Sequence, residues 1–395
     1  MKKFLALMLA LVMLFALASC GGDGKKDANA KVAMITDSGD ITDQSFNQTT
    51  YEACKQYCEG AKVDFKYYKP AGNSTPDRVA MIDAAVADGY NIIVMPGYLF
   101  GAAIVESAGN YPDVKFIALD VGAGDILEKG VEAKGGEYDY NPDNWNVKDY
   151  YHSENVYCAI YQEELCGYMA GYAAVKLGYT KLGFLGGMAV PAVQRYGYGY
   201  VQGADAAAKE LGNAADVTVN YIYGGQFFGD PDITARMDTW YNGGTEVVFA
   251  CGGAIYQSAA EAAAKVNGKV IGVDVDQAGI IDAYGTGMTV TSAMKGLAPA
   301  VKDALKDIIE NGNWANYAGK ITTLGLVSGD DPEANYVQIP MSSTQWADGK
   351  FTQDDYKALV KGMYEGTIKV SNDTSAESPA DVVSNITVDF QGNVK

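Results

Sequence analysis

Several carboxylates and one aromatic ring are crowded into a short stretch near the start of the chain. The stretch from Asp37 to Tyr51 reads DSGDITDQSFNQTTY, with acids at Asp37, Asp40 and Asp43 and a ring at Phe46. It has a single glycine, so it lacks the glycine-rich backbone that cradles phosphate groups. Carboxylates accept hydrogen bonds from hydroxyl and ring N–H groups, and they repel anions. These residue types therefore predict a site that favours hydrogen-bond donors over anionic groups.

The same stretch is predicted to be a strand-to-helix loop. The apolar run Val32 to Ile35 precedes it, and apolar residues at helical spacing follow it. Ser45 and Gln48 match the S-x-x-Q capping box, which predicts a helix start just after the carboxylates. In an open α/β sheet, a loop at the carboxyl end of a strand lines the ligand crevice. Taken alone, however, the loop is explained more simply as a polar, well-capped turn.

Other polar and glycine residues also follow predicted strands. These residues are Asp120, Gly252, Gly253, Asp274 and Lys295. Because the carboxyl ends of parallel strands share one edge of a sheet, we expect Asp120 on the same rim as Asp37. The two glycines would allow a ligand to approach the backbone closely.

The elements that must position these residues alternate along the whole chain. Nearly continuous apolar runs predict strands at 32–35, 63–68, 91–95, 115–119, 156–161, 181–185, 217–223, 246–250, 270–273, 289–292, 321–326 and 337–339. Helices are predicted over 75–88, 193–211 and 299–310, and small residues within 167–174 predict a closely packed helix. Such strands, separated by helices, are typical of parallel sheets covered on both faces. The fold class is therefore α/β, and 395 residues suffice for two domains.

The N-terminus has the pattern of a bacterial signal peptide that ends in a lipobox. MKK precedes a short apolar run, and the small residues Leu17-Ala18-Ser19 precede Cys20. Cleavage there would leave a diacylglycerol-modified cysteine, and two or three acyl chains anchor a protein stably. We therefore expect removal of residues 1–19, lipidation of Cys20, and a flexible leash over 20–30. The protein would be held on the extracytoplasmic face of the cell membrane.

Composition excludes several partners and sites. The formal net charge is −19, and loss of Lys2 and Lys3 with the signal peptide makes it −19 − 2 = −21. Such a charge argues against nucleic acid, heparin or anionic lipid as partners. His152 is the only histidine, which argues against a multi-histidine metal site, and we expect no cofactor. The remaining cysteines are expected to be buried thiols, at Cys54, Cys58, Cys158, Cys166 and Cys251.

A polar, tyrosine-rich excursion at residues 124–155 interrupts the alternation of strands and helices. It contains EYDYNPDNWNVKDYYHSEN, which is too long for a tight connection and too aromatic for a disordered linker. We expect an ordered surface segment. Trp145 and the tyrosines either cover the crevice, meet a partner, or pack on one another, the last being the simplest interpretation. The polar tail beyond residue 371 is expected to be ordered only in part.

Several motifs, in order along the chain, resemble those of the basic membrane lipoproteins, also called purine nucleoside receptor-like proteins. They are DSGDITDQSFNQ (Asp37 to Gln48), EELCGYMAGYAA (Glu163 to Ala174), GFLGGMAVP (Gly183 to Pro191, continuing to Tyr196, Gly199 and Gly203), GVDVDQ (Gly272 to Gln277) and Lys295. Members of that family are substrate-binding proteins of ABC importers. The resemblance implies a purine nucleoside or related nucleoside as ligand, delivery to an ABC permease with its ATPase subunits, and no enzymatic activity.

The family fold is the type I periplasmic-binding-protein fold, in which two doubly wound parallel-sheet lobes joined by a hinge close on a ligand. It predicts lobe 1 over 31–160 and lobe 2 over 161–276. Residues 277–371 would return to lobe 1 and form the hinge crossovers, and 372–395 would be the tail.

The resemblance also assigns candidate ligand-binding residues. They are Asp37, Ser38, Phe46, Asn47, Asp120, Tyr196, Phe249, Gly252, Gly253, Asp274 and Lys295. Asp37 and Ser38 would hydrogen-bond the base, and Phe46 would stack on it. Asn47 would order the loop or reach the ligand. The remaining acids and the lysine would bind base or ribose, the two glycines would supply backbone contacts, and either Tyr196 or Phe249 would form the second aromatic wall.

Some alternatives stay open. Asp274 and Lys295 could instead form a structural ion pair in the hinge, and Asp43 is better explained by the start of the helix, where a carboxylate suits the dipole. The family's glycine-serine pair appears here as Leu165-Cys166-Gly167, so packing there could differ, and the excursion has no counterpart in shorter members. A sugar or other small polar solute suits the same fold. Nucleoside hydrolase or phosphorylase activity and a surface signalling or adhesion role are further rivals.

Overall fold

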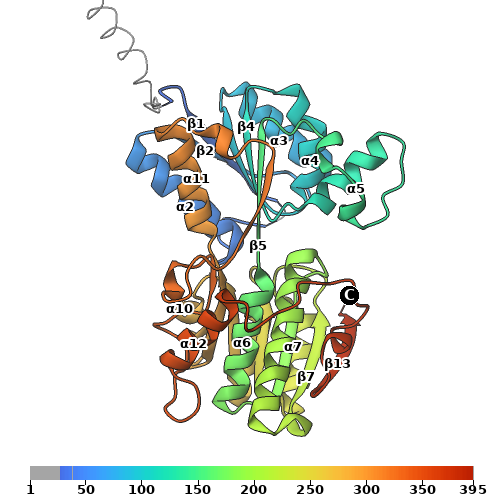
Figure 1. Cartoon of the computed structure of the whole chain (residues 1–395), viewed down its shortest axis with the longest axis vertical. Helices are drawn as coiled ribbons and strands as arrows, with labels where there is room; N and C mark the ends of the chain where they lie inside the picture. Colours follow the sequence, from blue (N-terminus) through green and yellow to red (C-terminus); the bar gives the residue numbers. More distant parts are fainter. Residues whose placement is uncertain (1–26, 38, 395) are drawn as a thin grey trace, which may run out of the picture.

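The computed structural model describes residues 27–37 and 39–394, and it consists of two lobes, one above the other (Figure 1). Residues 1–19, Cys20 and Ser38, to which the sequence assigned a signal peptide, a lipid and a ligand contact, lie outside the described residues. Each lobe is an α/β unit built around one sheet, as the apolar runs predicted.

Lobe 1 is built on a six-stranded, fully parallel sheet with the strand order β11-β5-β4-β3-β1-β2. The strands are β1 (Lys31–Ile35), β2 (Asp64–Tyr68), β3 (Ile92–Pro96), β4 (Lys115–Leu119), β5 (Val156–Tyr161) and β11 (Lys320–Leu324). The helices α2 (Phe46–Ala61) and α11 (Leu297–Glu310) lie side by side over one face. The helices α3 (Thr75–Ala87), α4 (Phe100–Ser107) and α5 (Ala123–Ala133) pack in sequence on the other.

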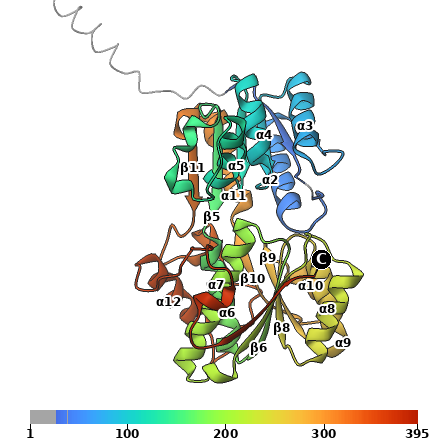
Figure 2. The same ribbon diagram turned by 90° about the vertical axis from the view of Figure 1, so that its right-hand side faces the viewer.

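Lobe 2 repeats this architecture. Its sheet has the order β12-β10-β9-β8-β6-β7-β13, parallel except where β12 joins β10. The strands are β6 (Lys181–Gly186), β7 (Thr218–Tyr223), β8 (Val247–Cys251), β9 (Lys269–Asp274), β10 (Thr289–Lys295), β12 (Val337–Gln338) and β13 (Thr387–Asn393). Figure 2 shows α6 (Glu163–Leu177) and α7 (Pro191–Leu211) on one side of it and α8 (Pro231–Asn242) and α9 (Tyr256–Val266) on the other. The remaining α-helices of the described residues are α10 (Ala278–Ile281) and α12 (Gln353–Tyr364).

The central strands explain why the sequence runs are apolar without alternation. Val32 and Met34 of β1 belong to the apolar cluster that includes Ala53 and Cys54 of α2. The alternate residues of the strand, Ala33 and Ile35, pack with the helices on the opposite face. Both faces are covered, so every position of the strand favours an apolar side chain. The five predicted thiols are also buried and free.

Both sheets reverse their strand order at an equivalent place. In lobe 1 the chain starts at β1, moves to β2 on one side and continues with β3 on the other, and β6, β7 and β8 repeat this pattern in lobe 2. Ligands of doubly wound sheets bind outside the carboxyl ends of the strands at such a reversal. The two reversals face each other across the space between the lobes, where one cleft is lined by residues following β1 and β6.

Three crossovers join the lobes in the part of the chain that the structure describes. They run from β5 to α6, from β10 to α11, and from β11 to β12. The backbone N–H of Gln162 donates to the carbonyl of Leu324 at 3.0 Å, and that of Gly296 donates to the carbonyl of Tyr336 at 2.6 Å. The crossovers are thus hydrogen-bonded to one another and form a single hinge.

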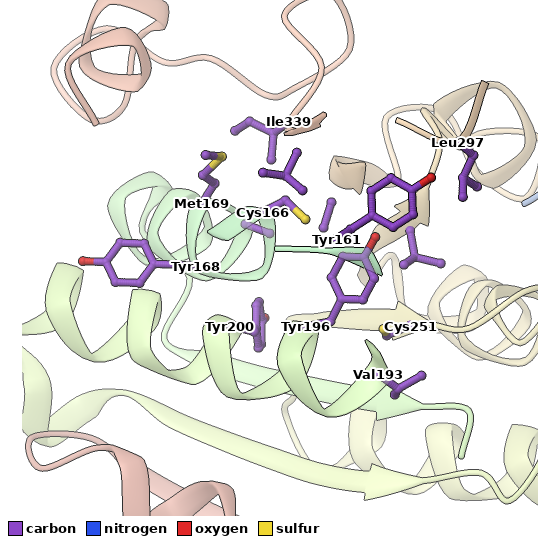
Figure 3. Packing of buried hydrophobic residues seen from close by; sticks show 14 of the residues in the cluster. Tyr161, Cys166, Tyr168, Met169, Val193, Tyr196, Tyr200, Cys251, Leu297 and Ile339 are labelled. Atoms are coloured by element: carbon purple, nitrogen blue, oxygen red, sulfur yellow. The ribbon is translucent and has the colours of Figure 1, made fainter. Parts of the chain in front are cut away.

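Helices α6 and α7 approach each other unusually closely. A Cβ atom on Gly167 would lie 2.2 Å from the carbonyl oxygen of Tyr196, and one on Gly199 would lie 2.1 Å from that of Glu164. Only glycine permits this contact between two helix backbones. Figure 3 shows the apolar side chains that fill the neighbouring space, among them Met169, Tyr196 and Tyr200. The close packing predicted from the small residues is confirmed.

The path of the chain after residue 276 differs from the expected one. Strand β10 continues the sheet of lobe 2, so the expected boundary of lobe 2 at 276 is too early. Only α11 and β11 return to lobe 1, whereas β12 joins β10 and α12 packs against α6 in lobe 2. The tail is also more ordered than expected, because β13 pairs in parallel with β7 and covers the edge of that sheet.

The excursion is shorter than the sequence suggested, because α5 occupies residues 123–133. The remainder packs on itself. Trp145 lies edge-on to Tyr138 and Tyr150, with ring centroids 6.0 and 5.6 Å away, and its indole N–H donates to Asp139 at 2.7 Å. No helix within the described part of the chain is long and apolar enough to cross a membrane.

Candidate ligand-binding site

A cleft of about 1520 Å³ lies between the lobes, and most of the predicted residues line it. Of the predicted set, the lining residues are Asp37, Phe46, Asn47, Asp120, Tyr196, Gly252, Gly253, Asp274 and Lys295. They come from strand ends and helix starts of both lobes, so the fold brings together positions that are far apart in the sequence. Phe249 does not line the cleft.

The loop between β1 and α2 is organised by Asp43. Its carboxylate accepts backbone hydrogen bonds from Ser45, Asn47 and Gln48 at 2.9, 2.9 and 3.0 Å. Asp43 therefore caps the helix, in agreement with the structural role expected for it. The capping box predicted for Ser45 and Gln48 is wrong, since the Ser45 side chain makes no cap hydrogen bond. Its hydroxyl instead donates to Asp274 of lobe 2 at 2.6 Å.

The carboxylate of Asp37 is surrounded by residues of lobe 1. Its carboxylate accepts the backbone N–H of Gly39 at 2.8 Å. A Cβ atom on Gly97, which has φ of +122°, would lie 2.5 Å from the carboxylate, so this position requires glycine. Burial lowers the pKa of Arg78, and the charge of Asp37 opposes that change. The Arg78 guanidinium is thus an electrostatic neighbour of Asp37.

Asp120 and Asp274 occupy strained backbone positions at the ends of β4 and β9. Their φ angles are +59° and +66°, in the left-handed region that non-glycine residues seldom adopt. Such strain persists only where the surrounding structure enforces it, and it clusters at functional sites. Both side chains reach Lys295, the last residue of β10.

Lys295 lies at the centre of a buried charge cluster in the hinge. Its ammonium nitrogen is 2.5 Å from Asp120, 3.3 Å from Glu163 and 3.8 Å from Asp274. Burial alone would lower the pKa of Lys295, but the three carboxylates raise it above its usual range. The ammonium also lies 4.8 Å from the ring centroid of Phe46. Lys295 therefore stays charged while facing both an aromatic ring and the acids.

Two buried acceptors in the cleft have no hydrogen-bond partner within the described residues. They are Oδ1 of Asp120 and Oδ1 of Asn47. Burial raises the pKa of Asp120 to about 6, and the charge of Lys295 opposes the rise. A buried acceptor without a partner is costly, so both atoms favour a ligand that brings donors.

The aromatic residues of the cleft differ in part from those expected. Tyr196 lines it, and its hydroxyl donates to Asp274 at 3.3 Å. Phe249 lies behind Tyr196 in the core, with ring centroids 5.9 Å apart and no exposed surface. Because β8 is buried on both faces, its sequence could not indicate which side chain reaches the cleft. Phe227 and Phe228 line the cleft from lobe 2 instead, and Phe228 is 57% exposed.

Gly252 and Gly253 accommodate one of these rings. Gly252 has φ of +148° and Gly253 has φ of +52°. A Cβ atom on Gly252 would lie 2.8 Å from the Phe227 ring, and one on Gly253 would lie 2.7 Å from the Phe227 carbonyl oxygen. The glycines therefore let the 224–230 loop approach β8 closely. No sequence signal indicated Phe227, because its loop approaches this glycine pair only in the folded chain.

The excursion also reaches the cleft, although it packs on itself. Tyr138 and Tyr140 line the mouth from lobe 1, and Tyr140 is 75% exposed. Within the described residues, no group of three or more histidine, cysteine, aspartate or glutamate side chains is placed to hold a metal ion.

Comparison with known proteins identifies the family of this chain. Residues 30–330 match the family model described as ABC transporter substrate-binding protein PnrA-like. The chain belongs to this family. It is a substrate-binding protein of the ABC-transporter type and not an enzyme.

Several characterised and uncharacterised relatives match over most of their length. The ABC transporter nucleoside-binding protein BmpA of Lactococcus lactis is 26% identical over 87% of this chain and 96% of the relative. Basic membrane protein A of Borreliella burgdorferi is 26% identical over 83% of this chain and 87% of its own. An uncharacterized lipoprotein of Pyrococcus furiosus is 25% identical over 92% and 85%.

Solved structures support the fold. An ABC transporter solute-binding protein from Aeropyrum pernix superposes with a TM-score of 0.60 at 22% identity, covering 87% of this chain and 88% of that one. One from Conexibacter woesei gives a TM-score of 0.60 at 20% identity, covering 87% and 99%. The type I periplasmic-binding-protein fold inferred from the sequence is therefore confirmed.

Proposed function

We propose that this protein captures a purine nucleoside, or a related nucleoside, between its two lobes and delivers it to an ABC permease. The observation that carries the proposal is the composition of the cleft. Ionisable acceptors at Asp37, Asp120 and Asp274 lie together with the ring of Phe46 and, from the opposite lobe, that of Phe227. A nucleoside supplies both a flat base to stack and hydroxyl and N–H donors.

The two kinds of contact differ in what they contribute. Stacking on an aromatic ring is worth about 1–3 kcal/mol per base. Carboxylates accept charge-assisted hydrogen bonds, which are stronger than neutral ones and favour paired donors such as vicinal ribose hydroxyls. The name of the Lactococcus lactis relative, a nucleoside-binding protein, supports the same ligand class.

Anchoring to the extracytoplasmic face of the membrane is part of the proposal. It rests on the lipobox that ends in Cys20 and on the description of relatives as lipoproteins. Radiolabelled palmitate should be incorporated into the wild-type protein in cells, and Cys20→Ala should abolish the label and release the protein from the membrane fraction. A labelled Cys20→Ala protein would contradict this anchor.

A screen of ligands tests the nucleoside assignment. The mature protein lacking the lipid is mixed with inosine, guanosine, adenosine, ribose, glucose or galactose, and the melting temperature is measured. A ligand that binds only the native state raises the melting temperature by mass action. We expect upward shifts with nucleosides and none with the sugars. Shifts with a sugar alone would show that the cleft belongs to a sugar-binding member of the same fold.

A further inference from the structure

We propose that Glu163 is a positioning residue: its carboxylate bridges Lys295 to Arg195 and holds the Lys295 ammonium at the floor of the cleft, ready for a ligand. The inference rests on the proposed function in one respect, namely that the cleft around Lys295 is the ligand site. Glu163 itself does not line the cleft.

The bridge uses both oxygens of one fully buried side chain. Oε1 of Glu163 lies 3.3 Å from the ammonium of Lys295, and Oε2 accepts the Nε–H of Arg195 at 2.7 Å. Glu163 has no exposed surface. A buried carboxylate is tolerated when it is paired and hydrogen-bonded, and here each oxygen has a cationic partner.

The position of the bridge is set by the backbone. Glu163 is the first residue of α6, directly after the crossover from β5, and Arg195 lies in the first turns of α7. The glycine contacts between α6 and α7 fix the two helices relative to each other. Lys295 stands at the start of the second crossover. The ion pair between Glu163 and Lys295 therefore links two of the three hinge crossovers.

Glu163 differs from the other two acids around Lys295 because it does not line the cleft and a ligand there does not contact it. Asp120 and Asp274 line the cleft, and Oδ1 of Asp120 has no hydrogen-bond partner within the described residues. A ligand that donates to these two carboxylates competes with their attraction for Lys295. Glu163 is shielded behind them, so its attraction for Lys295 is the same in the empty and the occupied cleft. It is the one partner that keeps the ammonium in place throughout binding.

The next residue offers a matched control. Glu164 is also buried, at 2% exposure, in the same helical turn, but it makes no ion pair with Lys295, and its Oε2 has no hydrogen-bond partner within the described residues. Changing either glutamate to glutamine removes one carboxylate from the start of α6. Only Glu163→Gln also removes a partner of Lys295.

The test has two readouts, measured on the mature wild type, Glu163→Gln and Glu164→Gln. The first is the affinity for inosine by titration calorimetry. The second needs no ligand: each protein is treated briefly with formaldehyde and dimethylamine-borane, and methylation of the peptide containing Lys295 is measured by mass spectrometry. We expect Glu163→Gln to weaken inosine binding at least tenfold and to raise the methylation rate of Lys295 several-fold. Glu164→Gln should match the wild type in both.

Two further variants keep the outcome decisive. Val248→Ala weakens the lobe 2 core away from the hinge, and it shows how much methylation follows from lower stability alone. Glu163→Asp keeps the charge but retracts the carboxylate, and it replaces Glu163→Gln in the test if that variant does not fold. We expect it to change inosine affinity and Lys295 methylation in the same direction as Glu163→Gln, but by less. Wild-type inosine affinity and wild-type Lys295 methylation in a folded Glu163 variant overturn the inference.

Failure of the proposed function would look different. If the wild type binds no nucleoside, the nucleoside proposal fails, yet the methylation comparison still decides whether Glu163 holds Lys295. If the wild type binds inosine and both glutamine variants behave alike, the nucleoside proposal stands and the role of Glu163 is refuted.

Discussion

Phe46 carries the clearest energetic prediction at the scale of single residues. Because stacking on a base is worth about 1–3 kcal/mol, Phe46→Ala should weaken inosine binding roughly 5- to 150-fold without unfolding the protein. Titration calorimetry measures the change. Phe390→Ala, on β13 outside the cleft, is the control and should bind as the wild type does. Equal affinities for wild type and Phe46→Ala would remove Phe46 from the site.

The raised pKa of Asp120 predicts that ligand affinity depends on pH. Burial raises the pKa of Asp120 to about 6, against the opposing charge of Lys295, so the carboxylate is ionised at pH 7.5 and largely protonated at pH 5. Protonation removes the charge that accepts ligand hydrogen bonds, so affinity is present above pH 6 and lost below it. We expect inosine to bind about tenfold more weakly at pH 5 than at pH 7.5.

The matching variant tests the origin of that pH dependence. Asp120→Asn should bind weakly at both pH values and show a flat profile. A profile in Asp120→Asn as steep as that of the wild type would assign the proton to another group.

Glu164 predicts a pH effect on stability. Burial raises the pKa of Glu164 from 4.5 to about 7. The native state therefore holds this proton more tightly than the unfolded state, so the stabilising contribution is complete below pH 4.5 and is lost as pH rises through 7. The difference between these two pKa values corresponds to about 3 kcal/mol in the free energy of unfolding. Glu164→Gln should accordingly gain stability relative to wild type at pH 8 but not at pH 4.5, as measured by denaturant unfolding.

How far the site could be predicted depended on the kind of residue. Asp120 and Asp274 were found because each ends an apolar run, which places it at the rim of a parallel sheet. Phe227 was missed because it lies in an irregular loop with no periodic pattern. Glu163 lies inside the EELCGYMAGYAA motif, but the sequence did not indicate its role. That role follows from its ion pairs with Arg195 and Lys295 in the structure.

At the scale of elements, the contact between α6 and α7 determines how the charge cluster is assembled. A Cβ atom on Gly199 would lie 2.1 Å from the Glu164 backbone, so Gly199→Ala should force the helices apart and cost about 1–3 kcal/mol or more. Gly60 in α2 has open space around it, and Gly60→Ala should gain about 0.5–1 kcal/mol. Thermal unfolding of both variants measures the contrast. Destabilisation of the same size in both would show that the helix contact is not tight.

The existence of most helices and strands could be predicted, but their assignment to sheets could not. Apolar runs identified β4 and β5 within their observed bounds, because a strand buried on both faces leaves a local signal. Pairing is not local: β10 and β13 each join a strand of lobe 2 through hydrogen bonds that no sequence pattern encodes. For that reason the boundary at 276 and the loosely ordered tail were wrong.

At the scale of the whole molecule, the hinge predicts a change of shape. Closure of two lobes about a few connecting segments is a common response of such folds to ligand. Saturating inosine should lower the radius of gyration measured by small-angle X-ray scattering. Phe46→Ala at the same inosine concentration should respond less. Binding of inosine by calorimetry with an unchanged radius of gyration would show that the ligand is held without closure.

The late strands β11 and β13 also bear on how the protein is made. The first sheet is finished only by residues 320–324, and the outer edge of β7 is covered only by residues 387–393. Bare sheet edges template pairing with other chains. A nascent chain therefore leaves one edge of β5 and one edge of β7 unpaired until these late strands have been made, and removal of β13 would expose the edge of β7 again. Neither lobe is a continuous stretch of the chain, because α11 and β11 belong to lobe 1 whereas the segments before and after them belong to lobe 2.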